Sequence, residues 1–179
     1  MDIYNDYINF INEYEDFLYD LKDNDLNILL FFNDCINVMD YLSKKHLDGN
    51  TLEMEEDEVF DIGYGYLSNS LYDLKYYYEE IFKKDIKMMK KYDDLLIYHF
   101  TLDDIKGYLI SNDQFDSEKE SIFNDCEDLI EDYISNHKEV TNDILFKLQS
   151  YSEEILPKKN DFQPAYVVFG LMADELDLF

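Results

Sequence analysis

The sequence predicts an all-α protein, a single-domain bundle of about seven or eight helices. Glycine (5) and proline (2) are scarce in 179 residues, and apolar residues recur at steps of three and four through nearly the whole chain. Hydrophobic residues make up 46% of the chain, which is enough to build a core in spite of the charge. We expect an acidic bundle over 1–157, with a linker and a C-terminal helix over 158–179 packed on the same domain.

The first predicted helix covers residues 1–23. Its apolar seam alternates steps of four and three, at Ile3, Tyr7, Phe10, Tyr14, Phe17 and Leu21. The opposite side carries a nearly unbroken row of carboxylates, at Asp2, Asp6, Glu13, Asp16, Asp20 and Asp23. Such a helix offers an acidic surface rather than a catalytic group.

Two more helices are predicted before the middle of the chain. One covers about 26–45 and ends in a turn over 46–51 that contains Gly49 and Asn50. The next opens on an acidic run, Glu53, Glu55, Glu56, Asp57 and Glu58. Part of this run serves as capping, because carboxylates in a first turn complement the helix dipole. Gly63 and Gly65 interrupt the start of this helix and indicate close helix contact or a kink.

Five lysines follow, at steps that place them largely on one helical face: Lys83, Lys84, Lys87, Lys90 and Lys91. We favour a solvated face that pairs with this protein's own carboxylates. The alternative is a local site for an acidic partner.

The second half of the chain reads as four helices. Thr101–Asp104 resembles a capping box for a short helix to about Ser111, and 112–116 is a loop. Ser117 and Glu120 form another capping box, for a helix to about His137. Its inward residues are Ile122, Cys126, Leu129, Ile130 and Tyr133, and its outward acids are Glu118, Asp125, Asp128 and Asp132.

Two helices complete the prediction. Thr141 caps a helix that ends at Pro157, with the seam Ile144, Leu148, Tyr151 and Ile155. After a linker over 158–163, Pro164 suits the first turn of a last helix through Phe169, Met172 and Leu176.

Cys35 and Cys126 fall at apolar helical positions, so we expect buried, reduced thiols rather than a disulfide. The N-terminus has no secretion signal, and the longest apolar run, near 165–173, is too short to span a bilayer. We therefore expect a cytoplasmic protein that does not bind membranes.

Charge is the most informative property of the composition. With 42 acidic and 15 basic residues the formal net charge is −27. Repulsion among so many carboxylates lowers the stability of the fold. We therefore favour the interpretation that the acidic residues bind a partner of opposite charge over the alternative that the acidity has no functional role. Every basic residue is a lysine. Direct binding of nucleic acid is therefore not expected, since neutralising phosphates needs basic surface.

The sequence offers no recognisable chemistry, so we predict that the protein is not an enzyme and takes no cofactor or metal. His46, His99 and His137 lie far apart, near predicted helix ends, and outside any zinc or di-iron motif. The glycines form no phosphate-binding loop. An acidic metal-dependent hydrolase stays as an alternative.

The last five residues, Glu175-Leu176-Asp177-Leu178-Phe179, resemble the Gln-Leu-(Ser/Asp)-Leu-Phe peptide by which bacterial proteins dock in the sliding-clamp groove. Glu175 departs from the glutamine of that family. The resemblance implies a replication-associated adaptor whose clamp peptide includes Leu176, Asp177, Leu178 and Phe179. The alternative is that Leu176 and Phe179 close the last helix, beneath Phe169 and Met172.

The leading hypothesis is a non-enzymatic acidic inhibitor of a basic, nucleic-acid-handling protein. It is either an immunity protein to a nuclease toxin or a phage anti-defence mimic of nucleic acid, such as an anti-CRISPR. Carboxylates three or four residues apart lie about 5–6 Å apart on a helix, near the interval between successive phosphates. The predicted partner-binding residues are Asp2, Asp6, Glu13, Asp16, Asp20, Glu55, Glu56, Asp57, Asp125, Asp128 and Asp132.

Overall fold

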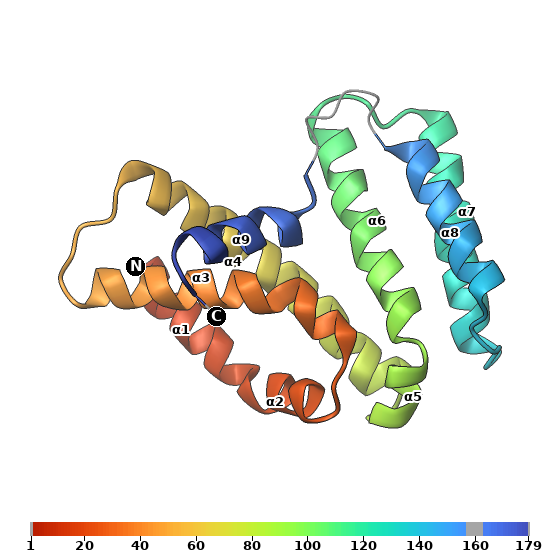
Figure 1. Cartoon of the computed structure of the whole chain (residues 1–179), viewed down its shortest axis with the longest axis horizontal. Helices are drawn as coiled ribbons and strands as arrows, with labels where there is room; N and C mark the ends of the chain where they lie inside the picture. Colours follow the sequence, from red (N-terminus) through yellow and green to blue (C-terminus); the bar gives the residue numbers. More distant parts are fainter. Residues whose placement is uncertain (1, 157–162, 179) are drawn as a thin grey trace. The chain divides into compact units, whose positions relative to one another are not determined.

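The computed structural model describes residues 2–156 and 163–178, and these residues are all-α. The chain is 81% helix with no strand in the described part, which confirms the predicted fold class (Figure 1). The described residues form nine α-helices, eight of them with seven residues or more. They are α1 (Ile3–Glu13), α2 (Glu15–Asp23), α3 (Leu30–Leu47), α4 (Met54–Tyr76), α5 (Ile86–Lys91), α6 (Asp93–Ser111), α7 (Ser117–Ser135), α8 (Asn142–Ile155) and α9 (Ala165–Glu175). A 3₁₀ turn (Asn27–Leu29) precedes α3, and a π turn (Tyr77–Ile81) follows α4.

The chain divides into two compact units. The first holds the chain up to Met89 and again from Ala165, and the second holds Lys90–Pro164. The predicted organisation, a bundle over 1–157 with a linker and helix over 158–179, stays a prediction beside this division. The predicted linker falls largely outside the described residues, while α9 packs on α3 of the first unit.

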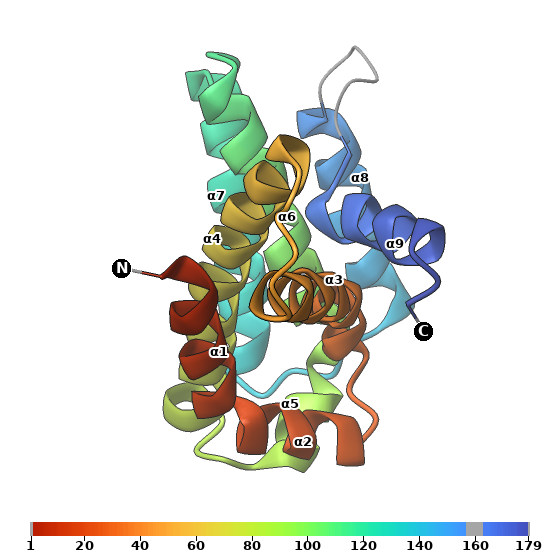
Figure 2. The same cartoon turned by 90° about the vertical axis from the view of Figure 1, so that its left-hand side faces the viewer.

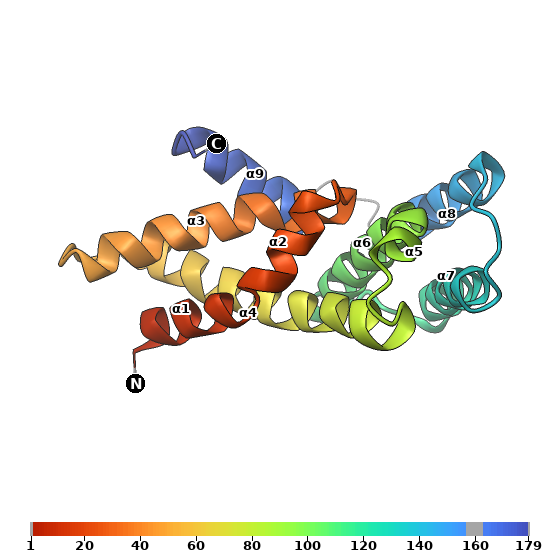
Figure 3. The same cartoon turned by 90° about the horizontal axis from the view of Figure 1, so that it is seen from below.

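Helix α3 is the centre of the first unit. Figures 2 and 3 show α3 between α4 on one side and α9 on the other, and α1 also contacts it. Phe32, Cys35 and Met39 follow at helical steps and are fully buried. Capping starts α4, because the Glu53 side chain accepts from the backbone of Glu56 while the Glu56 carboxylate accepts from the N–H of Glu53.

Gly63 of α4 is the point of closest approach in this unit. A Cβ at this position would lie 2.5 Å from Sδ of Met39 on α3 and 3.2 Å from Cζ of Phe169 on α9. Three helices can therefore meet here only because the residue has no side chain. The sequence left open close contact or a kink at these glycines, and at Gly63 the reason is close contact.

The prediction of one continuous helix over 1–23 is wrong. The chain turns at Tyr14 (φ −96°, ψ 0°), so α1 and α2 are separate helices that meet at an angle (Figure 3). The partners of the seam explain the turn: Phe10 stacks on Tyr64, whereas Phe17 contacts Tyr78 much further along the chain. The seam also begins one residue later than predicted, because Tyr4 is buried and Ile3 is 38% exposed.

The five lysines do not share one helical face. Lys83 and Lys84 adopt the left-handed conformation (φ 51° and 63°), which ends the helix before α5 begins. All five lysines are exposed, and none forms an ion pair with a carboxylate among the described residues. The pairing that we favoured from the sequence is therefore not formed there.

The second unit consists of α6, α7 and α8, which contact one another (Figure 1). The predicted capping box at Thr101 is wrong, because α6 begins eight residues earlier and passes through it. The Thr101 hydroxyl instead donates to the carbonyl of Ile97 at 2.8 Å, one turn back. This longer helix also places His99 within α6 rather than near a helix end.

Helix α7 is offset by one residue from the prediction. Its N-cap is Asp116, whose side chain accepts from the N–H of Lys119 at 2.9 Å, rather than Ser117. The buried stripe is correspondingly Phe123, Cys126, Ile130 and Ile134, while Ile122, Leu129 and Tyr133 are half-buried. In α8, Ser152 is buried and the predicted Tyr151 is half-buried.

A buried polar contact joins α6 to α7. Nδ1 of His99 lies 2.8 Å from Oε2 of Glu127, and His99 is only 9% exposed. A buried imidazole that loses its hydrogen-bond partner lowers the free energy of unfolding. The contact therefore stabilises the pairing of α6 with α7.

Both cysteines are unpaired and buried, as predicted. Burial raises the pKa of the Cys35 thiol and raises that of Cys126 to about 12. Because the thiolate is the reactive species, both side chains are expected to be inert. No helix in the described part of the chain is long and apolar enough to cross a bilayer.

The contact at Gly63 predicts opposite effects for two neighbouring glycines. Gly63→Ala should lower the melting temperature, because overpacking costs about 1–3 kcal/mol and exceeds the gain in helix propensity. Gly65→Ala should instead stabilise the protein by about 0.5–1 kcal/mol, since a Cβ there meets nothing within 4 Å. Thermal unfolding followed by circular dichroism measures both. Equal shifts in the same direction would contradict the close contact.

Removal of the Glu127 carboxylate should destabilise the second unit. Glu127→Ala deprives His99 of its 2.8 Å partner, and we expect a loss of about 1–3 kcal/mol in urea unfolding. Glu131→Ala is the matched control, one turn along α7 and exposed, and should change stability by less than about 0.5 kcal/mol. Similar losses in the two variants would show that the pair has no special role.

Candidate functional site

Aromatic rings hold α1 against α4. The rings of Tyr4 and Tyr7 lie 4.4 and 5.5 Å from that of Phe60, and Phe10 stacks on Tyr64 at 5.6 Å. Tyr4, Tyr7 and Phe60 are buried, so these contacts belong to the core of the first unit. The position of α1 beside α4, visible in Figures 2 and 3, is thereby fixed by aromatic packing.

Tyr4 gathers carboxylates from both helices. Its ring contacts that of Phe60, the ring of His46 is stacked on it at 3.9 Å, and its hydroxyl donates to Oδ1 of Asp57. Burial raises the pKa of Tyr4, and the hydrogen bond and charge of Asp57 raise it further, followed by the charges of Asp61 and Asp2. Asp57 and Asp61 of α4 and Asp2, the N-cap of α1, therefore all lie near the Tyr4 side chain.

Tyr64 of α4 lies near acids of α1. Burial raises its pKa, and the charges of Asp6 and Glu13 on α1 add to the shift. We define the α1–α4 acidic face as Asp2, Asp6, Glu13, Asp57 and Asp61, together with Tyr4 and Tyr64. Four of these five acids are exposed and Asp6 is half-buried, so the charge is accessible from solvent.

Among the described residues, no lysine is paired with the carboxylates of the α1–α4 acidic face. Within the described residues, none of its five carboxylates forms an ion pair with a lysine; the lysine ion pairs lie elsewhere, at Lys45–Glu56, Lys75–Glu79 and Lys138–Asp132. Carboxylates from two helices thus share a surface without a lysine ion pair in the described part of the chain. This arrangement suits the binding of cations supplied by a partner.

The acids of α2 are separate from this face. Asp16 and Asp20 are exposed, but the turn at Tyr14 ends the row that the sequence predicted. Burial raises the pKa of Tyr78 and the charge of Asp20 adds to it, so Asp20 lies beside a different tyrosine. Nζ of Lys75 lies 5.0 Å from the Tyr14 ring, which places a cation near the turn.

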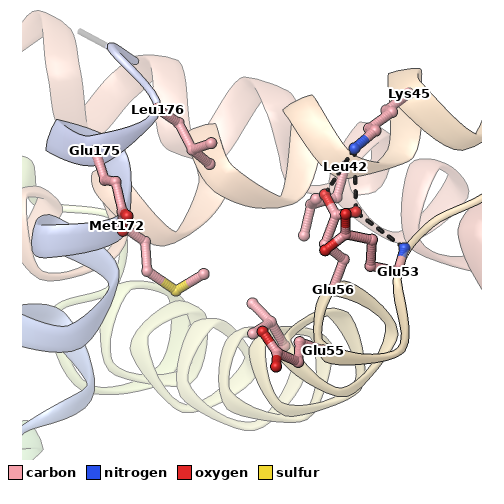
Figure 4. A pocket seen from close by; sticks show the side chains of 9 residues that line it. Leu42, Lys45, Glu53, Glu55, Glu56, Met172, Glu175 and Leu176 are labelled. Atoms are coloured by element: carbon pink, nitrogen blue, oxygen red, sulfur yellow. Dashed lines mark hydrogen bonds and ion pairs between the residues drawn. The ribbon is translucent and has the colours of Figure 1, made fainter.

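The acids at the start of α4 point in different directions. Asp57 belongs to the α1–α4 acidic face, whereas Glu56 accepts from Nζ of Lys45 at 3.0 Å and from the N–H of Glu53 at 3.0 Å. The Glu56 carboxylate therefore already serves in helix capping and in an ion pair within the protein. Glu55 lines a groove between α3, α4 and α9 (Figure 4).

The acids of α7 are partly neutralised within the second unit. Asp125, Asp128 and Asp132 line a shallow pocket of about 350 Å³ together with Lys147 and Tyr151. Hydrogen bonds from Lys138 and Asn136 lower the pKa of Asp132. This group is the less suitable of the two acidic surfaces, because two lysines compete with a basic partner.

The terminal peptide is folded onto the end of α9. The N–H of Asp177 donates to the carbonyl of Asp174 at 3.2 Å and that of Leu178 to Ala173 at 2.8 Å, with Asp177 left-handed (φ 55°). This is a Schellman motif, which an extended docking peptide would have to break. Leu176 is 36% exposed, and Phe179 lies outside the described residues. Clamp binding stays a prediction.

Comparison with protein-family models, curated proteins and solved structures finds no match to this chain.

Three members of the α1–α4 acidic face were missed from the sequence. Asp61 follows Asp57 by four residues, a spacing that already places both on one side of α4. Tyr4 and Tyr64 carried no such signal, since tyrosines are numerous and only the packing of α1 on α4 selects these two.

The environment of Tyr4 predicts a pH-dependent stability. Because its folded pKa is raised, the neutral phenol stabilises the folded chain fully below about pH 10, the unfolded pKa, and this contribution is lost as pH rises towards the folded value. Urea unfolding at pH 8 and pH 11 should show wild type losing more stability than Tyr4→Phe. An identical loss in both proteins would contradict a buried, carboxylate-bound Tyr4.

Proposed function

We propose that this protein is a non-enzymatic inhibitor that binds a basic, nucleic-acid-handling protein through the α1–α4 acidic face. The observation that carries the proposal is the grouping of acids around two tyrosines: Tyr4 donates to Asp57 and lies near Asp61 and Asp2, and Tyr64 lies near Asp6 and Glu13. None of these five carboxylates forms an ion pair with a lysine among the described residues. A net charge of −27 adds long-range attraction to any basic target.

The chemistry of the target follows from that of the face. A protein that holds nucleic acid presents lysine and arginine side chains to phosphates, and exposed carboxylates at helical spacing offer the same cations an alternative partner. Inhibition then needs occupation of the surface and no chemical step. Attraction of this kind increases the association rate and declines with salt.

Tyr64 gives the face an uncharged component. It is half-buried, its ring contacts those of Phe10 and Tyr7, and the acids Asp6 and Glu13 of α1 lie near it. Tyrosines near the centre of an interface commonly contribute much of the binding energy, because their rings exclude water from neighbouring charges. A partner with a cation beside an apolar side chain would use both parts of the face.

Two biological versions of this function remain distinct: an immunity protein for a nuclease toxin and an anti-defence mimic of nucleic acid. They differ in whether the inhibitor occupies the nucleic-acid site. A mimic competes with DNA for the target, whereas an immunity protein that binds beside the active site does not. We place either version in the cytoplasm, a reducing compartment that fits the two unpaired thiols.

Charge reversal on the face should reduce binding strongly. The partner is first captured from the source cell on immobilised protein and identified by mass spectrometry, and we expect a basic nucleic-acid-binding protein. The triple variant Asp6→Lys, Glu13→Lys, Asp61→Lys should then slow association with the purified partner by about tenfold or more, since electrostatic steering contributes about 10–10³-fold to such rates.

The control carries the same change of charge in the second unit, at exposed acids: Glu118→Lys, Glu131→Lys and Asp143→Lys. It should bind within about twofold of wild type at 150 mM salt, where exposed charges are screened beyond about 8 Å. Equal losses in the two triple variants would indicate net charge alone and reject the α1–α4 acidic face. Addition of a DNA duplex separates the mimic from the immunity protein.

A further inference from the structure

A groove lies between α3, α4 and α9 of the first unit, and none of the residues that line it belongs to the α1–α4 acidic face. Its volume is about 280 Å³, and its apolar lining consists of Leu42, Val59, Met172 and Leu176. Figure 4 shows Met172 of α9 and Leu176, which directly follows α9, facing Leu42 of α3 and the first turn of α4 across an open space. The flexible thioether of Met172 can adapt to different apolar groups.

The edge of this groove is acidic. Glu53, Glu55 and Glu175 line it and are exposed, and Glu56 lies among them. Lys45 is the one basic residue of the lining, and its Nζ is bound to both oxygens of the Glu56 carboxylate at 3.1 and 3.0 Å. Glu55 and Glu175 form no ion pair with a lysine in the described part of the chain. Four carboxylates therefore surround an apolar surface with a single ammonium.

Size and charge limit what the groove can hold. It is smaller than the usual range of small-molecule sites, about 300–1,000 Å³, and corresponds better to one or two side chains. Its carboxylates repel phosphate and nucleic acid. An apolar group would bury the lining, while a cation beside it would meet Glu55 or Glu175.

We infer that this groove binds a protein segment in which an apolar side chain lies next to a lysine or arginine. The apolar side chain occupies the space between Met172, Leu176 and Leu42, and the flanking cations pair with Glu55 and Glu175. This binding site goes beyond the proposed function, because the groove is a different surface from the α1–α4 acidic face and includes residues of α9.

The test uses full-length protein with methyl-¹³C methionine and three blocked peptides: Lys-Leu-Lys, Lys-Ser-Lys and Glu-Leu-Glu. Their binding is followed at 150 mM salt through the Met172 methyl signal, assigned with Met172→Leu. We expect Lys-Leu-Lys to shift this signal saturably, with a Kd of about 1 mM or lower, and the other two peptides to bind at least about tenfold more weakly.

Two pairs of variants locate the contact. Glu55→Lys and Leu176→Ser should each weaken Lys-Leu-Lys binding about tenfold, or about 1.4 kcal/mol. Their controls are Glu58→Lys, with the same change of charge on α4, and Leu171→Ser, 56% exposed on α9; both lie outside the lining and should bind within twofold.

Several outcomes would overturn the inference. One is the absence of a saturable shift, and another is binding that the groove variants leave unchanged. Equal binding of Lys-Ser-Lys or of spermine would mean that charge alone attracts the ligand. The α1–α4 triple variant should bind Lys-Leu-Lys normally, so failure here is distinguishable from failure of the proposed inhibitor function.

Discussion

The close packing of three helices at Gly63 is the contact on which the first unit depends. Met39 of α3 and Phe169 of α9 both occupy the space that a side chain at this position would take. Through this contact α9, which comes from the end of the chain, is held against helices formed near its beginning. The same packing positions α4, and α4 in turn provides one side of both surfaces described above: the α1–α4 acidic face and the groove beside α9.

Aromatic packing allows this protein to tolerate its charge. With few lysines available, the acids of α1 and α4 are brought together by ring contacts among Tyr4, Phe10, Phe60 and Tyr64 rather than by ion pairs. The tyrosines contribute in two ways, because their rings are apolar while the hydroxyl of Tyr4 donates to a carboxylate. Stability thus comes from rings and remains compatible with a surface of one sign.

The fold class was predictable because helical periodicity and the scarcity of glycine and proline are local properties. The errors occurred where tertiary contacts determine where a helix begins or ends. Tyr14 continues the apolar seam and carries no stop signal, yet the chain turns there because Phe10 and Phe17 find partners at different places on the chain. Thr101 matches a capping motif, but the helix already in progress satisfies its hydroxyl. Four of the five acids of the candidate site were predicted from the sequence. The meeting of Asp61 and Asp2 near Tyr4, and of Met172 and Glu55 in one groove, required the packing of distant segments.

The two inert thiols make the protein convenient for site-specific labelling. Cys35 and Cys126 are buried, and burial raises the pKa of both, so the native cysteines need not be removed before a new one is introduced on the surface. A single cysteine placed at an exposed position on α4 would accept a fluorophore under native conditions. Each of the two surfaces of the first unit can in this way report its own occupancy in an otherwise unaltered chain.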